Sequence, residues 1–581
     1  MFTSNRISRS TLRLTARLQP HSVVSARSSS VVKPAKIVQI HSLTSKQIHR
    51  SCNRLQLANN YSSNSRNVSI QIDKKIKSNA DNWKSLLSIY EIESGKFDHR
   101  NWASLFNRLK NVSEKDIERM KNDNTFKKMI ASLEHQLLID VKEAAKGKGN
   151  SDVQTLSNIL HALAKLGIKN APFLEVVEEE AKWILAKGDP QAIANIAWAC
   201  ATLQYQAPAF FQILDKQAAR LVNKGTPQNI SNTAWACATL QYKAPAFFQM
   251  LNKQAAYLVN KGNPQAIANT AWACATLQCD APAFFQMLDK QAAHLVGKGT
   301  PQTIANTAWA CATLQYDVPD LLFEIDSHSE KLVVSGTTQA ISNTVLAFAE
   351  LGYVPEALFG HLSSHLERFL KSADLQAISN VLWSIASLDI PHETEIIFQA
   401  LWEKVALRKT SMLVDENLRQ LAFAAVYARV SGRQLVVEIP TSLEKQMVES
   451  ISKQTDDAEG TNENEFSSLL SQIGFEHERQ VTPFGDTVGS FLAIDFACKK
   501  RKIAIEYDGE HHFLKNLSMG QATIGRETGR TVAKRRLLQK LGWKVVNIPY
   551  MDNIELSKNS SAKQAKKDYL KKKLLGVGVH L

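Results

Sequence analysis

The first 72 residues of this 581-residue chain contain no aspartate or glutamate, and the first acidic residue is Asp73. The same stretch holds eleven lysines and arginines, so it supplies eleven of the fifteen net positive charges and leaves only four for the rest of the chain. The basic character of the sequence therefore reflects its beginning. It is not by itself a signal of DNA binding.

An acid-free, serine-rich and arginine-rich start is typical of an organellar transit peptide. The arginines among the first 20 residues are spaced so that they share one helical face: Arg6, Arg9, Arg13 and Arg17. We interpret residues 1–72 as a transit peptide or disordered segment and expect a mitochondrial location, with a plastid as the alternative. A disordered basic tail without a targeting role is the other interpretation.

Cysteine is scarce as well: the chain has seven, and no Cys-x-x-Cys pair occurs. This excludes the common structural zinc spacings and a disulfide framework, and it indicates a reducing compartment. Four cysteines occupy the same position of an internal repeat, where a small buried side chain is expected: Cys200, Cys237, Cys274 and Cys311. The chain also lacks an apolar run of 18 residues, so we expect no membrane-spanning helix and no membrane partner.

An internal repeat with a period of 37 residues dominates the middle of the chain. Its recurring segment reads Gln-Ala-Ile-Ala-Asn-Ile-Ala-Trp-Ala-Cys-Ala-Thr-Leu in one copy. The segment begins at seven equally spaced glutamines: Gln154, Gln191, Gln228, Gln265, Gln302, Gln339 and Gln376. A fixed period of this size predicts a solenoid, because a single unit cannot bury its apolar face without a neighbour.

Each unit is expected to fold as a helical hairpin. The first helix follows Gly-x-Pro, as at Gly188, where the middle residue caps the helix and proline takes the first helical position. A break at Pro208 precedes one second helix, with Phe211 and Leu221 on its apolar side.

Composition divides the chain into five regions. We expect a transit peptide or disordered segment at 1–72, an N-terminal helical cap at 73–150, the helical repeat solenoid at 151–435, a linker with an acidic segment at 436–465, and a small α/β domain with a basic C-terminal helix at 466–581.

Carboxylates gather on consecutive predicted strands of this last domain. Asp495 lies on one strand, and Glu506 and Asp508 lie on the next, where side chains two residues apart point to the same face. His511 and His512 follow in the next loop. These five residues are candidate catalytic groups, and the three acids are candidate ligands for Mg²⁺ or Mn²⁺.

The segments Ile494-Asp-Phe-Ala, Ile505-Glu-Tyr-Asp-Gly-Glu-His-His-Phe513 and Leu541-Gly-Trp-Lys-Val-Val-Asn-Ile-Pro549 resemble the RAP domain. Through it they resemble the restriction-endonuclease-like fold of very-short-patch-repair nucleases. The resemblance implies that Asp495 and Glu506 match the two acids of the nuclease motif.

The match departs from that motif at Asp508, where a lysine is usual. Lys502 lies on the same strand but about 13 Å from Glu506, at ~3.3 Å per residue, which is too far to replace it. The acids therefore have two interpretations: a nuclease site, or remnants of a fold reused for binding, with Asp508-Gly509 forming a tight turn.

The repeat, with its Asn-Thr-Ala-Trp-Ala core, resembles the heptatricopeptide repeats that accompany RAP domains in organellar RNA-binding proteins, and the related octotricopeptide repeats. The expected fold class is an α-solenoid of 37-residue helical-hairpin repeats followed by a small α/β restriction-endonuclease-like domain. The resemblance implies binding of single-stranded organellar RNA, messenger or ribosomal, in RNA processing, stability, translation or ribosome assembly.

A polar stripe on the first helix is the candidate RNA surface, with Gln191, Asn195, Trp198 and Thr202 as one copy. Helical-repeat RNA readers use a fixed polar group and a variable selector for each base. The fixed candidates are Asn158, Asn195, Asn232, Asn269, Asn306, Asn343 and Asn380. The selector candidates include Ala192, Asn229, Ala266 and Thr303, and Lys534 and Arg535 are further candidate RNA contacts. This predicts a footprint of about seven or eight nucleotides.

The alternative is that the asparagines form a hydrogen-bonded ladder between stacked helices. The repeated tryptophans are then part of the core: Trp198, Trp235, Trp272 and Trp309.

Three functions follow from these patterns. The leading one is a mitochondrial RNA-binding protein without catalytic activity. The second is a metal-dependent RNA endonuclease that uses the RAP domain. The third is an armadillo-like scaffold that holds an extended peptide through the same asparagines. The sequence predicts no particular protein partner.

Overall fold

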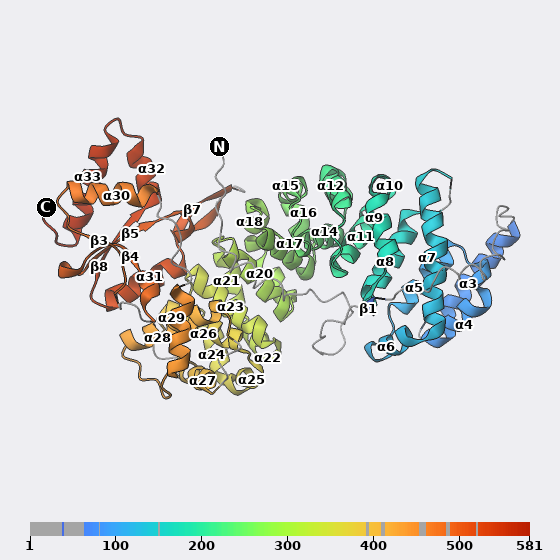
Figure 1. Cartoon of the computed structure of the whole chain (residues 1–581), viewed down its shortest axis with the longest axis horizontal. Coiled ribbons are helices and arrows are strands. Elements are labelled where there is room, and N and C mark those ends of the chain that lie inside the picture. Colours follow the sequence, from blue (N-terminus) through green and yellow to red (C-terminus); the bar gives the residue numbers. More distant parts are fainter. Residues whose placement is uncertain are drawn as a thin grey trace. The chain divides into compact units, whose positions relative to one another are not determined.

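A computed structural model describes residues 38–39, 63–80, 82–148, 151–390, 394–407, 413–452, 461–483, 488–518 and 521–581. Most of the predicted transit peptide lies outside these ranges. The chain divides into two compact units, an N-terminal unit that ends at Phe284 and a C-terminal unit that begins at Phe285 (Figure 1). Among the described residues, no helix combines the length and the apolar character needed to cross a membrane.

Helices fill the region before the repeats: α3 (Ser63–Ser78), α4 (Trp83–Glu93), η2 (Ser94–Lys96), α5 (His99–Leu109), α6 (Glu114–Asn122) and α7 (Asn124–Ala145). Helix α3 corrects the end of the predicted disordered segment, because its first ten residues belong to 1–72. Ile72 and Ile76, one helical turn apart, are buried, and the Ser69 hydroxyl donates to Asp98 Oδ2 at 2.8 Å. These contacts attach α3 to the fold.

The repeats of the N-terminal unit begin with α8 (Val153–Lys165), β2 (Ile168–Lys169), α9 (Ala171–Glu179) and α10 (Ala181–Lys187), and β1 (Val38–Gln39) pairs with β2 in parallel. They continue with α11 (Pro190–Thr202), α12 (Pro208–Lys216), α13 (Ala218–Lys224), α14 (Pro227–Thr239), α15 (Pro245–Lys253), α16 (Ala255–Lys261) and α17 (Pro264–Leu277). Helix α18 (Pro282–Lys290) runs across the boundary between the units.

The C-terminal unit continues the array with α19 (Ala292–Lys298), α20 (Pro301–Thr313), α21 (Pro319–Ser327), α22 (Ser329–Ser335), α23 (Thr338–Leu351), α24 (Glu356–Ser364), α25 (Leu366–Ser372), α26 (Leu375–Leu388), α27 (Glu395–Ala406), α28 (Asp415–Val430) and α29 (Thr441–Ser452). A long array of helical repeats is thus confirmed, but the hairpin is corrected. The repeats that begin at Gln154 to Gln339 each have three helices.

The third helix arises from a bend that the sequence does not signal. Gln217 separates α12 from α13 with φ −100° and ψ 15°, outside the helical range. Its N–H still donates to Ile213 O at 3.0 Å, so the helical spacing of apolar residues continues through the bend. Because no proline or glycine marks this position, the pattern predicts one helix where the structure has two.

A column of acidic or amide side chains joins successive repeats. Each of these side chains accepts a hydrogen bond from a backbone N–H at the start of the next repeat's second helix, whose own N-cap residue provides no side-chain bond. The pairs are Glu178 with Ala209 (2.9 Å), Asp215 with Phe247 (2.8 Å), Asn252 with Phe284 (3.1 Å), Asp289 with Leu321 (2.8 Å) and Asp326 with Leu358 (2.8 Å). The cap is thus supplied by the neighbouring repeat, which couples helix formation to stacking.

The C-terminal domain contains a four-stranded sheet in the order β3-β4-β5-β8. Its elements are α30 (Thr461–Gln472), β3 (Glu478–Val481), η4 (Ser490–Leu492), β4 (Ile494–Cys498), η5 (Lys499–Arg501), β5 (Ile503–Asp508), η6 (Glu510–His512), β6 (Phe513–Ser518), β7 (Gln521–Glu527), α31 (Gly529–Lys540), β8 (Lys544–Pro549), α32 (Tyr550–Ser557) and α33 (Ala562–Gly576). Strands β3, β4 and β5 are antiparallel, and β8 is parallel to β5. The antiparallel hairpin β6–β7 was not predicted.

Residues alternate between the two faces of β5. Ile503 and Ile505 belong to a buried cluster with residues of α30 and α33, such as Phe466 and Leu574. Glu506 and Asp508 therefore point to the opposite face, where α31 lies. A small mixed α/β domain after the helical array is thus confirmed.

The expected linker at 436–465 needs correction, because α29 and the start of α30 lie within it. Leu443, Met447 and Ile451 are buried at a spacing of one helical turn, and α29 packs on α28. These apolar residues form a buried helical face. The acidic residues 454–460 lie outside the described ranges.

Candidate functional site

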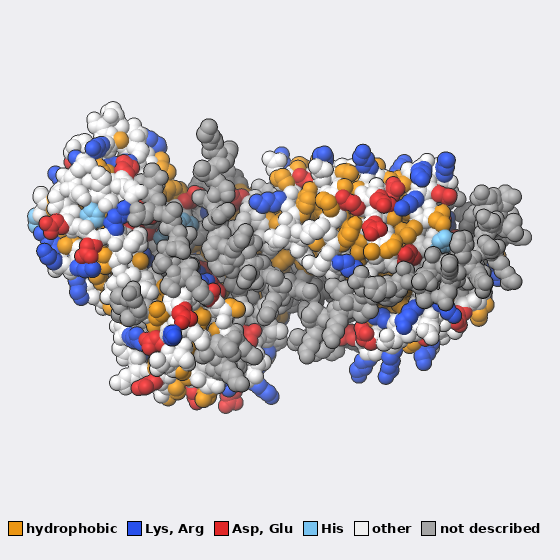
Figure 2. Space-filling view, in the orientation of Figure 1, with side chains coloured by type: hydrophobic (Ala, Val, Ile, Leu, Met, Phe, Trp, Pro, Cys, Tyr) orange, Lys and Arg blue, Asp and Glu red, His pale blue; other side chains and the backbone are white. Residues whose placement is uncertain are grey.

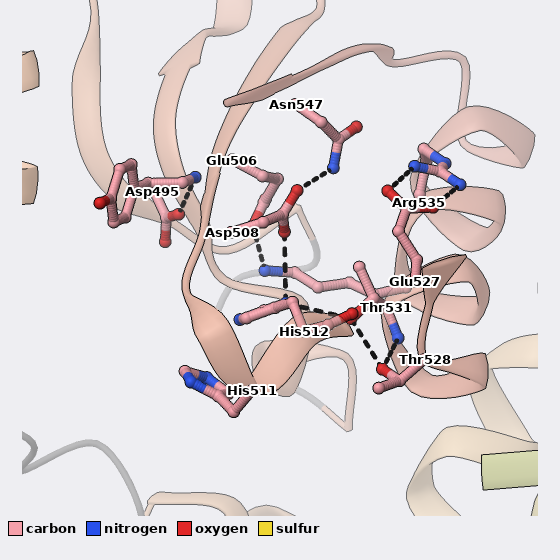
Figure 3. Close-up of polar contacts among 12 residues, drawn as sticks. Asp495, Glu506, Asp508, His511, His512, Glu527, Thr528, Thr531, Arg535 and Asn547 are labelled. Carbon is pink, nitrogen blue, oxygen red and sulfur yellow. Dashed lines mark hydrogen bonds and ion pairs between the residues drawn. The ribbon is translucent and has the colours of Figure 1, made fainter. Parts of the chain in front are cut away.

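Of the acids predicted from the sequence, Glu506 and Asp508 lie at the C-terminal end of β5, beside α31, and Asp495 lies on the neighbouring strand β4 (Figure 3). Glu506 Oε2 accepts a hydrogen bond of 2.5 Å from Lys534 Nζ on α31, and the side chains are 7% and 27% exposed. Burial raises the pKa of Glu506 to about 8, against the opposing charge of Lys534. Burial favours a lower pKa for Lys534, but the neighbouring carboxylates, Glu506 first, raise it on balance. The ammonium group therefore keeps its proton and fills the space beside Glu506.

Asp508 lies at the centre of a second set of contacts. Asn547 Nδ2 on β8 donates to its Oδ2 at 2.5 Å, and His512 Nδ1 lies 3.2 Å from its Oδ1. Burial raises the pKa of Asp508 to about 6 and lowers that of His512 to about 3, so the imidazole is neutral at pH 7. His512 Nδ1 also lies 3.1 Å from the Thr531 hydroxyl in the first turn of α31. This network fixes α31 on the sheet.

Asp495 and His511 lie apart from this network in Figure 3. Asp495 Oδ2 accepts the backbone N–H of Tyr507 at 2.8 Å, so it joins β4 to β5. The His511 ring packs against that of His512, with centroids 4.4 Å apart, and burial lowers its pKa. The five candidate catalytic residues are therefore neighbours, but their polar atoms do not converge on one point.

The donor set does not fit the expected Mg²⁺ or Mn²⁺ site. Each acid is already bonded to an N–H donor, from Tyr507, Lys534 or Asn547. Glu506 Oε1 is a buried oxygen that has no hydrogen-bond partner in the described part of the chain, and one such atom cannot hold a hard cation. Among the described residues, no group of three or more His, Cys, Asp or Glu side chains could hold a metal ion.

The helix α31 was a source of candidate RNA contacts, and two of its cations are paired inside the domain. Lys534 contacts Glu506, and Arg535 forms two hydrogen bonds of 2.5 Å with Glu527. Distance along the strand points to Lys502, but the structure places Lys502 just before β5, with a positive φ of 50°. Lys534 reaches the same acids from a helix 28 residues later.

The repeated asparagines fall into three groups along the array. In the earlier repeats Asn158, Asn195 and Asn232 are half-buried. Two of them accept a hydrogen bond on the side-chain carbonyl from the glutamine four residues earlier: Asn158 from Gln154 at 3.2 Å and Asn232 from Gln228 at 2.8 Å. In the last repeats Asn343 and Asn380 are buried, and Asn380 Nδ2 donates to Asn343 Oδ1 at 3.4 Å. The ladder geometry is thus present at the end of the array. Between these groups, Asn269 and Asn306 are 8% and 9% exposed, and Asn306 accepts from Gln302 at 2.7 Å.

The candidate selector residues are not placed on an open surface. Ala192 and Ala266 are 1% and 3% exposed. Asn229 forms a capping box with Thr226, and the Thr303 hydroxyl donates to Thr300 O at 2.8 Å. The residues at these variable positions therefore contribute to helix packing and helix capping.

The tryptophans of the stripe line up between repeats. Trp235 and Trp272 are 6% and 5% exposed, whereas Trp198 and Trp309 are half-buried. The Trp198 and Trp235 rings are 6.4 Å apart, and His161 continues the row 4.9 Å from Trp198. These rings pack against one another between repeats. In the N-terminal unit, the half-buried Trp198 leaves a partly accessible aromatic edge.

Comparison with known families gives two matches. Residues 505–573 match the RAP domain, as predicted. Residues 123–334 match a family described as RNA-editing substrate-binding complex 6 protein. No curated protein is similar enough to the chain to count as a match. This chain therefore combines a helical region similar to RNA-editing substrate-binding complex 6 protein with a C-terminal RAP domain.

Proposed function

We propose that this protein is a mitochondrial RNA-binding protein that holds single-stranded RNA along the first helices of its repeats and acts in RNA processing. Two matches support the proposal, one to a family whose description names binding of an RNA-editing substrate and one to the RAP domain. The partners would then include other proteins of an RNA-editing assembly. The restriction-endonuclease-like fold of the C-terminal domain is part of the same proposal.

The observation that carries the proposal is the paired amide on the stripe. Where Gln228 donates to the Asn232 carbonyl at 2.8 Å, the bond fixes both side chains. It uses one N–H and one carbonyl, so the Asn232 N–H groups and the Gln228 carbonyl remain suited to a ligand. A base edge carries donors and acceptors side by side, and the half-buried Trp198 adds an aromatic edge nearby.

The charge distribution favours hydrogen bonding and stacking over attraction to phosphates alone. Figure 2 shows hydrophobic, acidic and basic side chains interspersed over the face near α10, α12 and α15, without one large basic patch. Residues 73–581 carry only four net positive charges, so we expect the dependence of binding on salt to be modest. Cleavage is not part of the proposal, because hydrogen bonds from Tyr507, Lys534 and Asn547 already engage the three acids.

The proposal is tested by measuring affinity for single-stranded RNA of randomised sequence, using the full chain and matched variants. Asn195→Ala and Asn232→Ala remove stripe amides, whereas Gln212→Ala and Gln249→Ala remove exposed amides from the second helices of the same repeats. A hydrogen bond contributes about 1 kcal/mol, so each stripe variant should weaken binding about fivefold and each control should not. Equal affinities for all four variants would refute RNA binding by the stripe, and capture of an extended peptide in place of RNA would favour a scaffold.

A further inference from the structure

The RAP domain contacts the repeats of its own unit in a regular way. Arg526 on β7 donates to Leu351 O at 2.6 Å, at the end of α23. Arg536 on α31 donates to Ser387 O at 2.8 Å, at the end of α26. Lys540 Nζ contacts Asp389 Oδ1 at 2.7 Å, just beyond the end of α26. Cations are thus placed at helix C-termini, which carry partial negative charge.

The contact points on the array have the period of the repeat. The backbone N–H of Lys515 on β6 donates to Gln315 O at 2.7 Å, after the end of α20. Gln315, Gly352 and Asp389 are spaced 37 residues apart, and each residue has a positive φ at the end of its first helix. Strands β6 and β7 and helix α31 therefore contact three consecutive repeats at equivalent places.

Helix α31 also covers the stripe itself in the last two repeats. Arg530 forms an ion pair of 2.6 Å with Glu350 and lies over the Trp383 ring, 5.4 Å from its centre. Glu350 and Ser387 occupy the position that Thr202 has in its repeat, and Trp383 occupies the position of Trp198.

Backbone contact brings α31 close to this surface. A Cβ atom added to Gly529 would lie 1.7 Å from Ala349 O and 2.9 Å from Gly352 N. Only glycine permits this approach between α31 and the end of α23. The helix thus lies on the stripe through its backbone as well as through its arginines.

Burial of the asparagines increases along the array, and Asn269 and Asn306, which α31 does not cover, are already only 8% and 9% exposed. Under α31, Asn343 and Asn380 are 7% and 1% exposed, and Gln420 Nε2 donates to Asn380 Oδ1 at 2.9 Å. Asn158, Asn195 and Asn232 are half-buried. The repeats under α31 therefore satisfy their stripe amides internally.

We propose that α31 is a built-in occupant of the stripe, which closes the repeats beginning at Gln339 and Gln376 to RNA and leaves the five earlier repeats to bind it. This inference rests on the proposed function. It shortens the footprint from the seven or eight nucleotides expected from the repeat number to about five, at one base per repeat.

The test compares the same exposed glutamine in an open and in a covered repeat. Gln191 and Gln339 are both exposed and both begin the recurring segment. Gln191→Ala should weaken binding of a randomised single-stranded RNA about fivefold, as for a lost hydrogen bond, while Gln339→Ala leaves the affinity unchanged. Nuclease protection by the full chain should give a fragment of about five nucleotides.

A second variant tests the covering helix directly. The double substitution Arg530→Ala and Arg536→Ala removes the side-chain contacts of α31 with Glu350, Trp383 and Ser387. It should lengthen the protected fragment by about two nucleotides, one for each uncovered repeat. If that variant does not fold, the two glutamine variants and the wild-type footprint still test whether α31 closes the last two repeats to RNA.

The inference is overturned if Gln339→Ala weakens binding as much as Gln191→Ala, or if the wild type protects seven or more nucleotides. In either case RNA binding itself stands. An absence of RNA binding by the wild type, or loss of effect for both glutamine variants, would instead overturn the proposed function and the inference with it.

Discussion

Gly529→Ala is the substitution whose outcome most sharply tests how the RAP domain is attached to the repeats. Gly529 is the first residue of α31, and by helix propensity alone alanine should be favoured there by up to about 1 kcal/mol. The structure predicts the opposite sign. The new Cβ would lie 1.7 Å from Ala349 O and 2.9 Å from Gly352 N. Both are backbone atoms, so they cannot rotate away as a side chain could.

The size of the effect follows from what must move. Overpacking of this kind costs about 1–3 kcal/mol where the surroundings adjust. If α31 withdraws instead, the domain loses the bonds of Arg526 to Leu351 O and of Arg530 to Glu350, and each hydrogen bond to a charged group contributes about 1.5–3 kcal/mol. We therefore expect α31 to be destabilised on the array by about 3 kcal/mol.

Hydrogen exchange of the full chain is the suitable assay, since a protein of several units need not unfold in one step. Amides of α31 and of the last turn of α23 should lose about a hundredfold in protection, the equivalent of about 3 kcal/mol. Gly360→Ala is the matched control, because Gly360 lies inside α24 with no atom within 4 Å of an added Cβ. Unchanged protection of α31 in Gly529→Ala would refute the close approach.

Three further results are expected. Asp215→Ala should destabilise the N-terminal unit by about 1 kcal/mol, because it removes the cap on the Phe247 N–H, whereas Asp215→Asn should retain the cap; equal urea midpoints for both variants would contradict this. Lys534→Met should destabilise the RAP domain by about 2 kcal/mol, because it removes the charged donor from the buried Glu506 Oε2, and an unchanged midpoint of thermal unfolding would contradict this. Burial lowers the folded-state pKa of His161 from 6.5 to about 4, so its contribution to stability is complete above pH 6.5 and is lost as the pH falls toward 4. Urea midpoints at pH 7 and pH 5 should therefore differ less in His161→Gln than in the wild type.

The sequence by itself determined the repeat and the start of each first helix. The 37-residue period follows from counting, and a cap followed by proline, as at Asp189-Pro190, specifies the first turn through local chemistry. The RAP domain was predicted as well, because its motifs are contiguous segments that a family comparison matches at residues 505–573. Features that depend only on residues close together in the sequence could therefore be predicted from the sequence.

Some polar residues recur every 37 residues in the sequence, but only the stacked structure shows what they do. Glu178, Asp215, Asn252, Asp289 and Asp326 form a column with a spacing of 37 residues in the sequence. Nothing local shows that these residues cap the helix of the following repeat. The bend at Gln217 has no marker at all, because the hydrogen bond to Ile213 continues across it.

Only the tertiary structure decided which groups of the RAP domain and of the stripe are available to a ligand. Strand alternation predicts that Glu506 and Asp508 share one face of β5, but their bonding depends on Lys534 and Asn547, which come from elements that follow later in the chain. In the sequence, Arg530 is one of several cations of α31. Only the fold shows that it lies over Trp383, in a repeat almost 150 residues earlier. Periodicity specifies each helix and its buried face. Whether the exposed face meets solvent, RNA or another part of the chain depends on contacts between distant residues, and a local pattern does not contain them.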